Sequence, residues 1–235
     1  MIVDLLGDHH VHSTFSDDAE STLGENLAAA RDRGLTHIRL VEHVRRSTTW
    51  LPDFVAALER EDGHGLVVHN GVEAKILDAS GTLDVPDDLD GIETVLIADH
   101  RFPGPDGPWS PDETRRHLDA GLGAPEALDL LVGALVAAME ATGSAQLAHC
   151  FSILPKVGLD EDDLSDAQLE HWARTAAATG TLVEINEKWA CPGPRALAAA
   201  VAAGAALVAA TDSHVASDIG RYRRVPELIG QVGGR

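Results

Sequence analysis

The chain has 235 residues and a formal net charge of -20, with 18 Lys and Arg residues against 38 Asp and Glu residues. This excess of acid argues against a nucleic-acid polymer or an anionic membrane surface as the partner, because both are bound through clustered Lys and Arg side chains. The two cysteines form no CxxC pair, and the sequence shows neither a secretory leader nor an apolar run long enough to cross a bilayer. These features predict a cytoplasmic protein.

Short apolar stretches alternate with longer helical stretches from the start of the chain. The first helical stretch begins with a capping box formed by Thr22 and Glu25 and ends at Gly34, and the others also end at glycines or Gly-containing turns. Strands are expected at residues 2–6, 37–41, 66–74, 94–98, 145–148, 181–185 and 205–210, and further helices at 52–61, 124–143, 165–180 and 194–204.

This alternation, with strands apolar enough to be buried on both faces, predicts a parallel α/β fold. A closed barrel and an open doubly wound sheet both fit the pattern. No G-x-G-x-x-G motif follows the first strand, which disfavours the dinucleotide-binding form of the open sheet. The Pro- and Gly-rich segment 101–113 is expected to be a long loop on the functional face, and residues 1–235 are expected to form one domain.

Imidazole and carboxylate side chains fall at the end of nearly every predicted strand. In parallel α/β folds these carboxyl ends share one rim, where ligands bind. A lone histidine at such a position is more often a hydrogen-bonding residue of the core or rim. However, His10 and His12 are two apart in an extended segment and so face the same side, and Asp212 and His214 repeat this spacing at the last strand. The full set is His10, His12, His43, Glu73, His100, His149, Asp212 and His214.

Imidazole and carboxylate ligands without thiolates suit Zn²⁺, Mn²⁺ or Fe. Because the candidates outnumber the ligands that one ion uses, we expect two or three divalent ions, with Glu73 as a bridging carboxylate. Such a cluster generates hydroxide near neutral pH and polarises phosphoryl oxygens. The pattern therefore favours hydrolysis of a phosphate ester.

The motifs "DHHVHSTFSDD", "GVEA" and "TDSH", in order along the chain, resemble those of the PHP (polymerase and histidinol phosphatase) superfamily from residue 8 to about residue 214. The resemblance implies a distorted (β/α)7 barrel with its metal site at the C-terminal ends of the strands. It also implies hydrolysis of a small phosphate monoester by a metal-bridging hydroxide at a di- or trinuclear centre, as in histidinol-phosphate phosphatase.

Carried over by position, the resemblance makes the eight residues above metal ligands. Asp17 and Asp18 stay as alternatives for a ninth ligand, and Asp8 and Glu42 are expected to orient metal-bound imidazoles. The residues expected to act in catalysis are Glu73, Asp212 and His214. The general acid, the oligomeric state and the identity of the small phosphorylated metabolite are left open.

Cations beside these motifs are the candidates for contact with the substrate phosphate. Arg101 and Lys188 are preferred, because a guanidinium binds phosphate with two donors and an ammonium supplies a compact charge. Arg45 and Lys75 are further candidates, and Trp189, Trp109 and Phe102 are candidates for an apolar wall around the leaving group. The alternatives are a phosphodiesterase or nucleotide phosphatase of the same superfamily, an amide or lactone hydrolase, and a non-catalytic metal-binding regulatory module.

Overall fold

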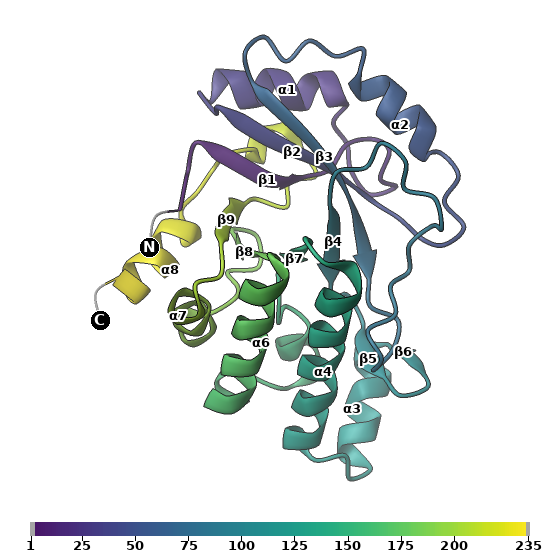
Figure 1. The fold of residues 1–235 in the computed structure, drawn as a ribbon, viewed down its shortest axis with the longest axis vertical. Helices are drawn as coiled ribbons and strands as arrows, with labels where there is room; N and C mark the ends of the chain where they lie inside the picture. The colour runs from purple at the N-terminus through teal and green to yellow at the C-terminus, as the bar shows by residue number, and fades with distance from the viewer. Residues whose placement is uncertain (1–2, 234–235) are drawn as a thin grey trace.

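The computed structural model describes residues 3–233, and their main feature is a sheet of seven parallel strands in the order β1-β2-β3-β4-β7-β8-β9. The first and last strands also meet, because Val11 bridges to Ser213 and the His12 N–H donates to the Ser213 carbonyl over 2.8 Å. The sheet is thus a nearly closed barrel, which confirms the predicted distorted (β/α)7 fold (Figure 1). Its strands are β1 (Gly7–Val11), β2 (His37–His43), β3 (Val67–Lys75), β4 (Val95–Ala98), β7 (Gln146–Ala148), β8 (Leu182–Asn186) and β9 (Leu207–Ala210).

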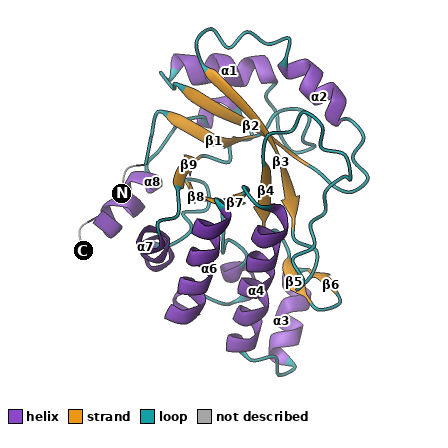
Figure 2. Cartoon of the chain, viewed as in Figure 1, coloured by secondary structure: helices purple, strands orange, loops and turns teal. Residues whose placement is uncertain are grey.

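Helices surround this barrel (Figure 2), and four of them lie where the sequence predicts: Leu23–Asp32, Ala124–Thr142, Asp166–Thr179 and Pro194–Ala203. The helix predicted at 52–61 is Leu51–Leu58, and the helices Pro111–Asp119, Leu154–Val157 and Arg224–Gly233 were not predicted. The Thr22–Glu25 capping box is present at the first helix, and the helix predicted from Ser165 has Ser165 as its N-cap and left-handed Gly180 as its C-cap. The helices are α1 (Leu23–Asp32), α2 (Leu51–Leu58), α3 (Pro111–Asp119), α4 (Ala124–Thr142), α5 (Leu154–Val157), α6 (Asp166–Thr179), α7 (Pro194–Ala203) and α8 (Arg224–Gly233), with 3-10 turns at Glu161–Asp163 and Ala216–Asp218.

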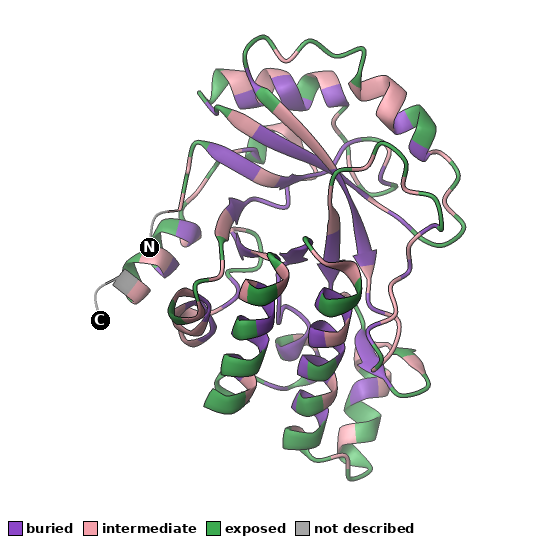
Figure 3. Ribbon diagram, in the orientation of Figure 1, coloured by how far each residue is buried: buried purple, intermediate pink, exposed green. Residues whose placement is uncertain are grey.

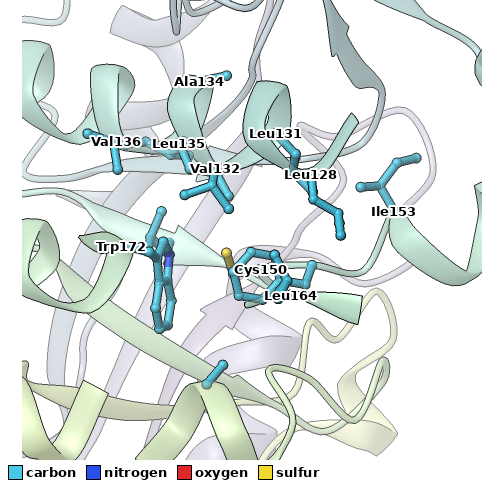
Figure 4. Packing of buried hydrophobic residues seen from close by; sticks show 14 of the residues in the cluster. Leu128, Leu131, Val132, Ala134, Leu135, Val136, Cys150, Ile153, Leu164 and Trp172 are labelled. Atoms are coloured by element: carbon cyan, nitrogen blue, oxygen red, sulfur yellow. The ribbon is translucent and has the colours of Figure 1, made fainter. Parts of the chain in front are cut away.

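The largest apolar core lies between the barrel and helices α4 and α6. Leu131 and Leu135 of α4 meet Trp172 of α6 and Cys150, which follows β7, and all four are at most 1% exposed (Figure 4). Burial raises the pKa of the Cys150 thiol well above its usual value, as expected of a small buried apolar side chain. The strands are buried while the outer faces of α4 and α6 are exposed (Figure 3), so the barrel forms a rigid base for the residues at its rim.

Two sequence predictions about secondary structure were wrong. The first strand was expected at residues 2–6, of which residue 2 lies outside the described part, but β1 is Gly7–Val11. The polar Asp8 and His10 are buried there because other polar groups satisfy them inside the barrel. The segment 101–113 was expected to be a loop, but it contains a hairpin of β5 (Phe102–Gly104) and β6 (Gly107–Trp109), with Gly107 at a φ of 136°. That dihedral suits a tight turn and is open to glycine.

Within residues 3–233, no helix combines the length and the apolar character that crossing a bilayer requires.

Candidate metal centre

The carboxylate of Glu73, near the end of β3, lies at the middle of the histidine cluster. Its Oε2 atom lies 2.9 Å from Nε2 of His43, 3.4 Å from Nε2 of His10 and 3.5 Å from Nε2 of His12. The Nε2 atoms of His10 and His12 are themselves 2.9 Å apart. Three imidazole nitrogens from β1, the following residue and β2 therefore converge on one carboxylate oxygen.

The other oxygen of Glu73 contacts the two histidines that follow β4 and β7. Its Oε1 atom lies 2.8 Å from Nε2 of His149 and 3.1 Å from Nε2 of His100. Glu73 is 2% exposed, and the carboxylate thus joins two groups of imidazoles, as a bridging ligand between metal ions does.

Asp212 and His214, after β9, complete the ring of side chains. Oδ1 of Asp212 lies 3.4 Å from Nε2 of His12, and 3.6 Å from Nδ1 of His214. Asp212 and His149 both have positive φ, at 54° and 31°, which non-glycine residues adopt at a cost. Backbone strain of this kind is typical of functional sites.

The adjacent acids Asp17 and Asp18 lie in different surroundings. Asp18 reaches both His43, at 3.3 Å from Nδ1, and His214, at 3.3 Å from Nε2. The side chain of Asp17 is 78% exposed, and its ion-pair contact is Arg45 at 3.8 Å. Carboxylate oxygens of both acids lie within 4.8 Å of a His43 nitrogen, so both stay candidates for the ninth ligand, and Asp18 is the one that contacts two imidazoles.

The pKa values in this cluster reflect buried charge. Burial raises the pKa of Glu73, but His100 and His10 outweigh burial and hold this pKa well below its usual value. Burial lowers the pKa of His149, but Asp99 and Glu73 raise it to about 10. Burial lowers the pKa of His12 to about 3, so this imidazole is neutral at pH 7. Buried carboxylates thus attract positive charge to this site.

These residues fit divalent ions. Oε2 of Glu73 is buried and has no hydrogen bond of good geometry in the described part of the chain, although the Nε2 atoms of three histidines lie within 3.5 Å, and a cation shared among these atoms would balance its charge. Imidazole and carboxylate atoms lie close enough together for shared coordination in His12–His43–His214, His10–His12–Asp212 and His43–Glu73–His100. The donor set contains nitrogen and oxygen without thiolate, which suits Zn²⁺, Mn²⁺ or Fe.

Two orienting carboxylates were missed by the sequence analysis. Oε2 of Glu184, in β8, lies 3.0 Å from Nδ1 of His10, and Oδ1 of Asp99 lies 3.7 Å from Nδ1 of His149. Both acids are fully buried. Carboxylates in this position fix the tautomer and orientation of a ligating imidazole. The available signal was an acid among apolar strand residues in "LVEIN" and "IADH".

The acids expected to hold imidazole rings bind other groups instead. Asp8 accepts hydrogen bonds from the Thr211 N–H (3.0 Å), the Thr211 hydroxyl (2.6 Å) and the Gly220 N–H (2.9 Å), so it fastens β1 to the end of β9. Glu42 accepts from the backbone of Ser13 and the hydroxyl of Ser16. Its effect on an imidazole is indirect, because the Ser16 oxygen lies 3.3 Å from Nδ1 of His12. The sequence cannot distinguish these partners, which are set by barrel closure.

Of the predicted phosphate-contacting cations, Lys188 lies at the cluster. Its Nζ is 3.4 Å from Oδ2 of Asp212 and 3.3 Å from Nδ1 of His214. Lys75 pairs with Asp84 at 3.0 Å. Arg45 and Arg101 are exposed, and Arg45 lies beside Asp17.

The aromatic side chains proposed as an apolar wall lie apart. The Nε1–H of Trp189 donates to Oδ2 of Asp212 over 2.9 Å, and this side chain is 41% exposed beside the cluster. Phe102 and Trp109 belong to the β5–β6 hairpin, where Phe102 is buried in the core beneath α4.

Comparison with known proteins places this cluster in context. No family model matches the chain. It is 25% identical over 236 residues to a protein named "Probable phosphatase" from Acetivibrio thermocellus, covering 96% of this chain and 86% of the relative. A protein of the same description from Vibrio atlanticus is 24% identical over 240 residues, with coverage of 98% and 87%.

The fold is similar to that of histidinol phosphate phosphatase from Lactococcus lactis, solved with zinc, L-histidinol and phosphate. The TM-score is 0.64 at 17% identity, covering 97% of this chain and 92% of that protein. The likeness to histidinol phosphate phosphatase agrees with the fold that the predicted resemblance implied. Because it stands at 17% identity, it establishes the fold alone, and the chemistry rests on the residues described above.

Proposed function

We propose that this chain hydrolyses a small phosphate monoester at a centre of two or three divalent metal ions. The observation that carries the proposal is the position of Glu73, a buried carboxylate in contact with the Nε2 atoms of five histidines from the ends of four strands. Support for a phosphoesterase comes from the relatives described as probable phosphatases and from the fold of histidinol phosphate phosphatase.

The proposed ligands are the side chains whose nitrogen and oxygen atoms lie close together in this cluster. Glu73 would hold ions through both of its oxygens, and Asp18 would be the ninth ligand in preference to Asp17. Glu184 and Asp99 orient the rings of His10 and His149. The remaining proposed ligands are His12, His43, His100, Asp212 and His214.

Divalent ions at this place supply a nucleophilic hydroxide near neutral pH and neutralise charge on the phosphoryl oxygens. The chain itself adds Lys188, whose ammonium lies at the edge of the cluster and is proposed to contact a phosphate oxygen. Trp189 holds Asp212 through its indole N–H and offers an apolar face to the leaving group. For Arg45, Arg101 and Lys75, the predicted contact with substrate stays a prediction.

The test is hydrolysis of p-nitrophenyl phosphate by metal-supplemented wild type, Glu73→Gln and Glu73→Ala. We expect both variants to lose more than about 100-fold in kcat/KM, because even the outer partners of metal ligands contribute about 10- to 100-fold. The exposed Glu59, at the end of α2, provides a control, and Glu59→Ala should keep wild-type activity.

Circular dichroism shows whether each variant folds. Near-normal turnover by folded, metal-supplemented Glu73→Ala contradicts the proposal. So does wild-type protein that releases no phosphate from any of a panel of monoesters after supply of Zn²⁺, Mn²⁺ or Fe²⁺.

A further inference from the structure

A second charged cavity adjoins the candidate metal centre. It has a volume of about 660 Å³ and is lined by the segments after β8 and β9 and by the start of α8. It shares Asp212 and His214 with the centre, so the two sites are directly adjacent. Its size falls within the range of small-molecule sites, which is roughly 300–1,000 Å³.

Positive side chains are concentrated in this cavity. Lys188, Arg221, Arg223 and Arg224 line it, and these are four of the 18 Lys and Arg residues in a chain of net charge -20. A cluster of cations on a strongly acidic protein creates a local potential that attracts anions to that place.

The acid at the base of the cavity is already engaged. The Glu187 carboxylate accepts the backbone N–H groups of Arg223, Arg224 and Val225 over 2.9, 2.8 and 3.0 Å. It therefore caps the first turn of α8, and the free amides of that helix end are not available to a ligand. The Arg224 guanidinium donates to the Lys188 carbonyl over 2.8 Å, which fixes the loop carrying Lys188.

Two arginines remain for a ligand. Arg221 and Arg223 are exposed, and among residues 3–233 neither forms an ion pair. The cavity lining holds two further acids: Asp212 pairs with Lys188 at 3.4 Å, and Asp218 is within 3.2 Å of the Ser217 hydroxyl. The guanidinium groups of Arg221 and Arg223 and the ammonium of Lys188 thus line one cavity, which adjoins the metal centre at Asp212 and His214.

We propose that this cationic pocket binds a second acidic group of the substrate through Arg221 and Arg223, while Lys188, at the edge of the metal centre, contacts the phosphate that is hydrolysed. The inference rests on the proposed function and narrows its substrate class to phosphate monoesters that carry a further phosphate or carboxylate. A guanidinium group binds either anion through two parallel hydrogen bonds, so both sources share one recognition chemistry. A substrate with an uncharged leaving group leaves these guanidinium groups unused.

The experiment uses alkyl phosphates of two to five carbons whose other end is a methyl, a carboxylate or a second phosphate. Phosphate release is measured with metal-loaded wild type, the double variant Arg221→Ala/Arg223→Ala, and a control double variant, Arg60→Ala/Arg116→Ala, at exposed positions elsewhere. The range of chain lengths covers the unknown separation between the two anionic groups.

We expect wild type to prefer a doubly anionic member over its methyl counterpart by at least about tenfold in kcat/KM, since hydrogen bonds to charged groups contribute about 1.5–3 kcal/mol. The Arg221→Ala/Arg223→Ala variant should lose this preference and retain its activity on the methyl series. The control variant should keep the preference. The carboxylate and phosphate arms show which anion the pocket accepts.

Titration calorimetry of the metal-loaded protein with an alkane bisphosphonate and the matching alkyl monophosphonate tests binding without turnover. We expect tighter binding of the bisphosphonate by wild type and equal binding of the two by Arg221→Ala/Arg223→Ala. If wild type has equal kcat/KM for all three end groups and binds the two phosphonates equally, the proposed pocket is contradicted. Absence of hydrolysis with the bisphosphonate preference intact overturns the proposed function and leaves the pocket standing.

Discussion

At the scale of single residues, Asp17 and Asp18 show how position decides role. The two acids are adjacent, but Asp18 contacts His43 and His214 while Asp17 faces solvent beside Arg45. The motif alone left both as ligands, because a sequence does not state which of two neighbouring side chains turns inward. The conformation of the turn that carries Asp17 and Asp18 determines which side chain faces the cluster, and that conformation depends on contacts with residues distant in sequence.

The matched variants Asp18→Asn and Asp17→Asn test this difference. Asp18→Asn should lower metal affinity and kcat/KM by at least about 10- to 100-fold, because it removes a charged oxygen shared by two imidazoles. Asp17→Asn should leave both unchanged. Metal titration and p-nitrophenyl phosphate hydrolysis measure the two effects, and equal losses in both variants, or a loss confined to Asp17→Asn, contradict the assignment.

His9 is the one histidine of the "DHHVH" motif that lies away from the cluster, with its Nε2 atom 3.1 Å from Nε2 of His37. Burial and the nearby positive charge of Arg39 lower its pKa to about 3, from an ordinary value of 6.5. Below about pH 6.5 the unfolded chain therefore binds a proton at His9 that the folded chain does not. The stability that depends on a neutral His9 is present above pH 6.5 and is lost progressively as the pH falls toward 3.

Replacement of this group should change the pH dependence of stability. As the pH falls from 7 to 5, wild type should lose up to about 1.4 kcal/mol of unfolding free energy per pH unit relative to His9→Gln, because one proton is taken up on unfolding. Urea unfolding at pH 7, 6 and 5 measures this, with exposed His171→Gln as the control that follows wild type. Parallel profiles for wild type and His9→Gln contradict the pKa shift.

At the scale of elements, local chemistry fixes where helices begin. The predicted capping box at α1 is present, with the Thr22 oxygen accepting from the Glu25 N–H and the Glu25 carboxylate accepting from the Thr22 N–H. Such caps are visible in the sequence because the partners are three residues apart. The placement of β1 at Gly7–Val11 depends on distant residues instead. Its polar Asp8 and His10 can be buried because Thr211, after β9, and Glu184, on β8, contact them.

The cap gives a prediction at this scale. Thr22→Ala should lower the unfolding free energy by about 1 kcal/mol, because the Glu25 N–H at the start of α1 loses the hydroxyl oxygen that accepts it. Thr22→Ser keeps this hydroxyl and should stay close to wild type. Urea unfolding compares the three proteins. Equal stability of Thr22→Ala and wild type contradicts the stabilising role of the box, and metal content should be the same in all three.

The clustering of the candidate ligands and the barrel were predictable for the same reason, and the role of these side chains as metal ligands stays a prediction. Parallel strands deliver their ends to one rim, so spacing relative to strands locates His43, Glu73 and His149 without coordinates. The partners of those ligands were not predictable, because Glu184 reaches His10 across 174 positions of sequence through the closed barrel. The β5–β6 hairpin was also missed, since Gly and Pro residues mark turns without showing whether strands flank them.

At the scale of the whole molecule, an acidic chain concentrates imidazoles, carboxylates and a few cations at one end of a barrel. The net charge of -20 is compatible with bound divalent cations. The cationic pocket beside Asp212 and His214 gives anions a place to bind despite the negative electrostatic potential of the rest of the protein. The account depends on one central claim, that the ring of ligands around Glu73 holds metal ions.

Elemental analysis by inductively coupled plasma mass spectrometry tests that claim most directly. Purified wild type, resupplied with Zn²⁺, Mn²⁺ or Fe²⁺ and freed of excess, should contain at least about two ions per chain, because eight or nine ligands exceed the coordination of one ion. Folded Glu73→Ala should contain fewer. A wild-type ratio near zero for every metal after resupply would contradict the account.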